Sequence, residues 1–147
     1  MQRPPRVKSV MTPFPTSIAW EAGVSDAVDM MEKHDIRHLP VTRDGELFGV
    51  VSDADLRVSR AVGIERIGRA AENDLQVGLV CTCDPYVVDL ETPLSQVADQ
   101  FAHRQIGSAL VTREGRLCGI LTTTDICRYL SQLLREMFTT THGNEAG

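Results

Sequence analysis

The chain contains one segment twice. Residues 7–59 align without a gap onto residues 77–129 at a constant offset of seventy, and fifteen of the 53 aligned pairs are identical. Unrelated segments of ordinary composition would match at about three or four of these positions. A repeat of this length predicts two similar units packed with pseudo-twofold symmetry and two equivalent clefts. Clefts of that kind favour ligand binding.

The bulk properties narrow the class of protein. At 147 residues the chain can form one compact domain or two intimately packed halves, and 42% hydrophobic with 24% charged residues is typical of a soluble globular protein. Residues 1–8 are basic but lead into neither a long apolar stretch nor a cleavage site, so we expect a cytoplasmic protein with no membrane association. The net charge of -5 makes nucleic-acid binding unexpected.

Hydrophobic periodicity predicts the same order of elements, β-α-β-β-α, in both repeats. This places the chain in the α/β (α+β) class. The apolar run at residues 47–51 is too continuous for a half-exposed strand, so we expect it to be buried on both faces. The predicted elements are strands at 17–19, 38–42 and 47–52 with helices from 24 and 53, and strands at 86–88, 108–112 and 117–122 with helices at 93–104 and from 124.

The repeat also sets the expected boundaries. They are a first domain at 7–62, a linker at 63–76, a second domain at 77–135 and a partly disordered tail at 136–147. The last helix carries a long apolar stripe, which we expect to cover its own core. The alternative is that its tip contacts a partner. The stripe comprises Ile126, Tyr129, Leu130, Leu133, Leu134 and Met137.

All four cysteines lie in the second repeat, at Cys81, Cys83, Cys118 and Cys127. The first repeat has no cysteine at the matching positions, and no second Cys or His pair stands at the spacing of a structural zinc site. We therefore expect reduced thiols with no metal. A redox or metal sensor built on Cys81 and Cys83 is the alternative.

Three segments carry a resemblance to a known family. They are residues 10–13, residues 34–41, and the run from Gly49 to Asp55, which recurs from Gly119 to Asp125. With these motifs the chain resembles a tandem pair of CBS domains, also called a Bateman module, over about residues 7–135. The resemblance implies a stand-alone regulatory protein that binds adenosyl compounds in clefts formed by the repeats, and it implies a homodimer.

The recurring run also has a direct physical reading. A Ser or Thr at a strand end lies beside a helix N-terminus, which favours an anion such as phosphate. An Asp three residues later can accept hydrogen bonds from a ribose diol. We therefore expect Ser52 and Thr122 near phosphate and Asp55 and Asp125 on ribose. The alternative is that these residues only cap their helices.

The two clefts are not expected to be equal. The resemblance implies that Ser17 and Ile18 contact the base or ribose, and the second repeat has valines there, including Val88. The first repeat is closer to the family pattern, so the preferred site is Ser17, Ile18, His38, Ser52 and Asp55. Three arginines are candidates for pairing with phosphate, although an exposed arginine is commonly a solvated charge. They are Arg37, Arg57 and Arg128.

No nucleophile and base arrangement, paired carboxylates, Walker lysine or metal-ligand cluster is evident, so we expect neither an enzyme nor a required cofactor. The favoured function is a regulatory module that binds AMP, ADP or ATP and signals in trans to an unknown effector protein. Other adenosyl ligands, such as S-adenosylmethionine or dinucleotides, stay open. An unliganded dimerisation scaffold is the alternative from a different class.

Overall fold

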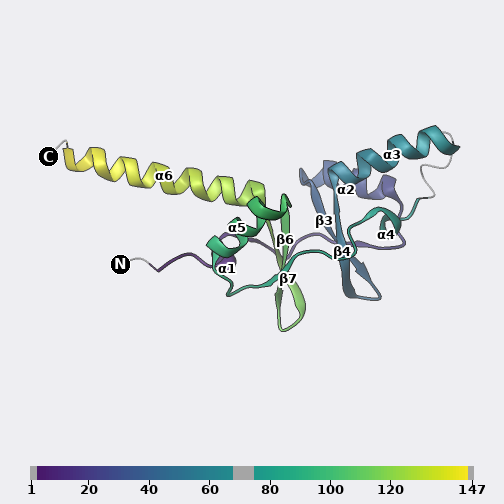
Figure 1. Cartoon of the computed structure of the whole chain (residues 1–147), viewed down its shortest axis with the longest axis horizontal. Helices are drawn as coiled ribbons and strands as arrows, with labels where there is room; N and C mark the ends of the chain where they lie inside the picture. Colours follow the sequence, from purple (N-terminus) through teal and green to yellow (C-terminus); the bar gives the residue numbers. More distant parts are fainter. Residues whose placement is uncertain (1–2, 68–74, 146–147) are drawn as a thin grey trace.

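The computed structural model describes residues 3–67 and 75–145, and the order β-α-β-β-α occurs in it twice (Figure 1). The predicted fold class is confirmed. The first repeat contains β2 (Ile18–Ala19), α2 (Val24–His34), β3 (His38–Arg43), β4 (Glu46–Ser52) and α3 (Asp53–Ile67). The second contains β5 (Val87–Asp89), α5 (Leu94–Arg104), β6 (Ser108–Arg113), β7 (Arg116–Thr122) and α6 (Thr123–Glu145). Three short elements were not predicted: α1 (Val7–Val10), β1 (Thr12–Pro13) and α4 (Val77–Val80).

Each repeat builds a small sheet from one parallel and one antiparallel strand pair. In the first repeat β2 pairs parallel with β3, and β3 pairs antiparallel with β4; β5, β6 and β7 repeat this pattern. The hairpin turns have positive φ at both central residues, 52° and 80° at Asp44 and Gly45 and 53° and 78° at Glu114 and Gly115. Both central residues of a type I′ turn need positive φ, and its twist matches the strands it joins.

The core has three parts. One apolar cluster lies within each repeat, between its sheet and its helices, and a third, formed by Val50, Leu110 and Ile120, lies between the two sheets. In β4, Val51 belongs to the first repeat's cluster while Val50 belongs to the cluster between the sheets. This alternation explains the apolar run in β4, and the expected burial of both its faces is confirmed.

The segments that lead into the two repeats are exchanged in space. The first leading segment, residues 7–13, packs on the second repeat: the Val7 N–H donates to Thr92 O (2.9 Å), and β1 pairs with β7. The second leading segment contains α4, and its Gly78 N–H donates to Trp20 O (2.8 Å) in the first repeat. Val7 and Val77 are both fully buried, each in the other repeat's core. Each repeat is one continuous stretch of sequence, but its leading segment packs in the other repeat. The two repeats therefore form one body.

Two parts of the chain differ from the prediction. One is the segment between the repeats, and the other is the last helix. Helix α3 continues to Ile67, into the expected linker, of which residues 68–74 lie outside the described residues. Helix α6 extends through Glu145, where a polar tail was expected, and projects well beyond the rest of the molecule (Figure 1). Ile126 and Tyr129 pack on the second core. Three further residues of the stripe do not cover this core, because Leu130, Leu134 and Met137 are 43–57% exposed.

Candidate functional site

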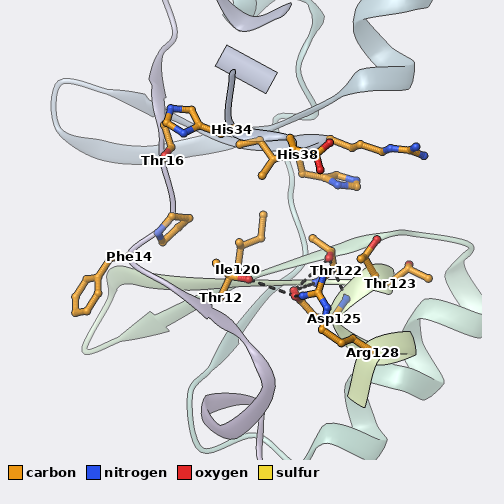
Figure 2. A pocket seen from close by; sticks show the side chains of 15 residues that line it. Thr12, Phe14, Thr16, His34, His38, Ile120, Thr122, Thr123, Asp125 and Arg128 are labelled. Carbon is orange, nitrogen blue, oxygen red and sulfur yellow. Dashed lines mark hydrogen bonds and ion pairs between the residues drawn. The ribbon is translucent and has the colours of Figure 1, made fainter. Parts of the chain in front are cut away.

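A cleft of about 560 Å³ lies between the two repeats (Figure 2). This volume falls within the range of small-molecule sites. Three segments line it: residues 12–16, which follow α1 and are called the crossing strand below, the end of α2 with the start of β3, and the end of β7 with the start of α6. The lining residues are Thr12, Phe14, Pro15, Thr16, His34, Asp35, Ile36, Arg37, His38, Ile120, Thr122, Thr123, Thr124, Asp125 and Arg128.

Asp125 is the buried carboxylate at one wall of this cleft, with 8% of its surface exposed. Its Oδ2 accepts hydrogen bonds from the Thr122 N–H (2.9 Å) and the Thr122 hydroxyl (3.1 Å), and the Asp125 N–H donates back to Thr122 Oγ1 (3.4 Å). This reciprocal arrangement caps the start of α6 and fixes the side chain. One carboxylate oxygen is therefore used for capping, and the other is available for a different partner.

The second oxygen of Asp125 faces the crossing strand. Asp125 Oδ1 accepts a hydrogen bond from the Thr12 hydroxyl (3.2 Å) and lies 3.7 Å from Arg128 Nη1 (Figure 2). Arg128 is 74% exposed, so this ion pair is largely solvated. Polar groups of both repeats thus converge on one carboxylate oxygen beside a helix N-terminus, where an anion is favoured.

Residues 34–38 form the facing wall. Helix α2 ends at His34, and the left-handed φ of 51° at its C-cap, Asp35, turns the chain toward β3. The Asp53 N–H donates to Arg37 O (2.8 Å), which ties this wall to the start of α3. A methyl group placed on Gly107 would lie 3.6 Å from both His38 Nε2 and Thr123 Oγ1, so both side chains lie close to Gly107 where the repeats join. Burial is the main cause that lowers the pKa of His38, opposed by the carboxylate of Asp55.

Five of the predicted site residues line this one cleft: Arg37, His38, Thr122, Asp125 and Arg128. They come from both repeats. Ser52 and Asp55 lie outside the cleft and cap α3 reciprocally, with the Ser52 N–H donating to Asp55 Oδ2 (3.0 Å) and the Asp55 N–H donating to Ser52 Oγ (3.1 Å). The set expected in the first repeat is therefore not gathered in this cleft, because its facing wall belongs to the other repeat.

The other predicted residues lie elsewhere. Ile18 and Val88 are 5% and 8% exposed and belong to the two repeat cores. Ser17 is exposed at the start of β2, beside the lining residue Thr16. Arg57 lines a different cavity, between α2 and α3. A ligand role stays a prediction for these four residues, as it does for the other predicted site residues.

Sequence reasoning missed the crossing strand as part of the site. Thr12 had a usable signal, since it is one of the identical pairs of the repeat (Thr12/Thr82). Phe14 had none. It adopts a left-handed φ of 47°, is 88% exposed, and points away from the two walls in Figure 2.

Each residue that lines the cleft has an equivalent in the other repeat, seventy positions away in the sequence. These equivalent residues carry a different charge. Arg37 and Arg128 of the cleft correspond to Gly107 and Val58 around Asp55. In the opposite sense, Phe14 and Thr123 correspond to Asp84 and Asp53, whereas His34 and Asp35 correspond to Arg104 and Gln105. The surroundings of Asp55 therefore have one cation fewer and one carboxylate more than the cleft. Because like charges repel an anionic ligand, the described cleft is the better place for a phosphate.

The cysteines show no metal-binding geometry. Across residues 3–67 and 75–145, the structure has no group of three or more His, Cys, Asp or Glu side chains placed to hold a metal ion. Burial, followed by the neighbouring Cys83, raises the pKa of the Cys81 thiol to about 11. A thiol with this pKa is almost fully protonated at neutral pH, which disfavours metal ligation and oxidation. In the same described residues no helix is long and apolar enough to cross a bilayer.

Two α/β repeats completed by exchanged leading segments, with a cleft between them that ends at a capped helix N-terminus, define a tandem-repeat module. The chain belongs to the CBS domain family, because the CBS domain model matches residues 7–60 and again residues 77–132. The predicted resemblance to a tandem CBS pair is thereby confirmed.

Known relatives share this arrangement over most of their length. Hypoxic response protein 1 of Mycobacterium tuberculosis is 26% identical over 127 residues, 85% of each chain. A structure of Hypoxic Response Protein I, with two coordinated zinc ions, has a TM-score of 0.69 at 25% identity and covers 84% of this chain and 98% of that one. The acetoin utilization protein AcuB from Vibrio cholerae has a TM-score of 0.80 at 25% identity, covering 93% and 98%. CBSX2, solved in complex with AMP, has a TM-score of 0.72 at 28% identity, covering 87% and 97%.

Proposed function

We propose that this protein is a regulatory module that binds an adenine nucleotide, AMP, ADP or ATP, in the cleft between its repeats. Occupancy of the cleft is communicated to a partner protein. We propose that the cleft binds the nucleotide, and we propose no reaction there.

One observation carries the proposal: Asp125 and the N-terminus of α6 face Arg37 and His38 across a cleft of nucleotide size. Asp125 Oδ1 accepts a hydrogen bond from a ribose hydroxyl in place of the Thr12 hydroxyl. The phosphate lies at the first turn of α6, where the helix dipole favours an anion. Ile36 and Ile120 provide apolar contacts for the base.

Two further facts support an adenine nucleotide. Arg37 and Arg128 line the same cleft, and both are exposed enough to reorient toward a phosphate. CBSX2, which is 28% identical and covers 87% of this chain, was solved with AMP. Because the surroundings of Asp55 are acidic, the binding stoichiometry we propose is one nucleotide per chain.

The decisive experiment is isothermal titration calorimetry with AMP, ADP and ATP on the wild type, Asp125→Ala and Asp55→Ala. Each substitution removes an equivalent helix cap, worth about 1 kcal/mol, and Asp125→Ala additionally loses the hydrogen bond from Thr12. Only Asp125→Ala is expected to abolish binding in the cleft. The proposal fails if no nucleotide binds the wild type, or if both variants bind it with unchanged affinity.

A second candidate is a dimerisation scaffold, and helix α6 supplies the observation that favours it. Leu130, Leu134, Met137 and Phe138 are 43–63% exposed and recur every three or four residues. A second copy of the same helix offers a matching stripe about a twofold axis. Light scattering of the wild type and Leu134→Glu, both without nucleotide, tests this candidate: a dimer that only the wild type forms supports it, and a monomeric wild type rejects it.

A further inference from the structure

A second cavity, of about 410 Å³, lies between α2 and α3 and adjoins the inter-repeat cleft. The two cavities share Asp35, Ile36 and Arg37 in their linings. Arg37 therefore stands at the boundary between them. The second cavity is lined by Val28, Met31, Glu32, Asp35, Ile36, Arg37, Asp53, Leu56, Arg57 and Arg60.

Three arginines line this cavity, Arg37, Arg57 and Arg60, and the second repeat has none of them. The equivalent residues are Gly107, Cys127 and Leu130. Helices α5 and α6 nevertheless pack on the sheet of the second repeat as α2 and α3 pack on the sheet of the first. The fold of a repeat thus does not require these arginines, which points to a role at this cavity.

The ion pair inside the cavity can exchange partners. Arg57 Nη2 lies 2.6 Å from Asp53 Oδ2, with the two side chains 70% and 40% exposed. A solvated pair of this kind contributes little to stability, so an incoming phosphate can replace the carboxylate as the arginine's partner. The carboxylates of Glu32, Asp35 and Asp53 balance the three arginines.

Arginines and carboxylates on the same cavity wall match a particular class of ligand. A nucleoside di- or triphosphate carries Mg²⁺, which binds phosphate oxygens, water and one or two carboxylates. Arginine pairs with the phosphate oxygens themselves. A nucleoside monophosphate has no distal phosphates for these arginines to bind. We propose, on the basis of the nucleotide-binding function above, that the cavity between α2 and α3 is a subsite for the distal phosphates of a magnesium-bound nucleoside di- or triphosphate.

The test compares the affinities for ATP and AMP, measured by calorimetry with Mg²⁺ present. The wild type is expected to bind ATP about tenfold more tightly than AMP, a ratio that corresponds to one additional charged hydrogen bond. In Arg57→Gln/Arg60→Gln the two affinities are expected to become equal, with the AMP affinity unchanged. Arg116→Gln, at an arginine that lines neither cavity, is expected to keep the wild-type ratio.

The outcomes separate this subsite from the proposed function. Equal affinities for ATP and AMP in the wild type, or an unchanged ratio in the double variant, overturn the subsite and leave nucleotide binding in the main cleft intact. Failure of every nucleotide to bind the wild type overturns both. Retention of AMP affinity in the double variant also shows that the variant is folded.

Discussion

The hydroxyl of Thr12 donates a hydrogen bond to Oδ1 of Asp125 over 3.2 Å, although 113 residues separate them in the chain. Thr12 belongs to the leading segment of the first repeat, and Asp125 begins the last helix of the second. This bond joins the exchanged segment to the carboxylate that we assign to the ribose. The ligand binding that we propose at Asp125 is therefore expected to be coupled to the packing of β1.

Thr12→Val is expected to lower the free energy of unfolding by about 1.5–3 kcal/mol, because it leaves a buried carboxylate oxygen without its neutral donor. The side chains have nearly the same shape, so packing is preserved. Urea denaturation measures the change. Thr82→Val, at the equivalent position, is the control, since the described structure shows no hydrogen bond from that side chain to Asp55. Equal losses in the two variants would contradict the assigned role of Thr12.

A matched pair of glycines tests the exchanged packing. A Cβ on Gly49 would lie 2.3 Å from the backbone oxygen of Thr82, whereas a Cβ on Gly119 would lie 2.4 Å from Met11 Sδ. A backbone carbonyl cannot move aside, but a flexible thioether can. We expect Gly49→Ala to cost about 2–3 kcal/mol and Gly119→Ala less than about 1 kcal/mol. Thermal denaturation of both variants decides this, and a reversed order would show that α4 is not packed as described.

His38 is expected to make the folded state sensitive to acid. Burial lowers its pKa below the ordinary value of 6.5, so the unfolded chain binds the proton more readily than the folded protein does. The stability contributed by neutral His38 is present above pH 6.5 and is lost as the pH falls toward the lowered pKa. Melting temperatures at pH 7.5 and 5.5 should differ less in His38→Asn than in the wild type. The exposed His103 provides the control, and His103→Asn should behave as the wild type.

Cys81 is expected to react slowly with alkylating reagents. With a pKa of about 11, about one thiol in a thousand is ionised at pH 8, and only the thiolate is nucleophilic. Mass spectrometry of protein treated with iodoacetamide at pH 8 and pH 10.5 should show Cys81 labelled much faster at the higher pH. Rapid labelling at pH 8 would revive the redox-sensor alternative.

The secondary structure was largely predictable because each element has a strong local signal. Helix α2 was placed from its apolar spacing, and its end at His34 agrees with the structure. The β3 and β4 hairpin follows from Gly45, whose positive φ the turn requires. The short elements α1, β1 and α4 were missed, because segments of two to four residues have no periodicity of their own. Their conformation depends on the other repeat.

The candidate site was predictable only in part. Thr122 and Asp125 were found because the capping motif is local and occurs twice. Their grouping with His38 and Arg37, and the contribution of Thr12, follow from contacts between the repeats. The sequence indicated the first repeat as the better site, and the cleft in the structure combines both.

The sequence by itself determined that this protein is a tandem repeat, the order of elements in each copy and the position of its two helix caps, because repetition, hydrophobic period and capping are all local properties of the chain. Only the tertiary structure decided which wall faces which. Burial of Val7 and Val77 in each other's repeat draws residues 7–13 across the junction, and this packing places Thr12 beside Asp125 and lets His38 and Asp125 line the same cleft. Apolar burial is non-directional, so no local pattern could specify that exchange.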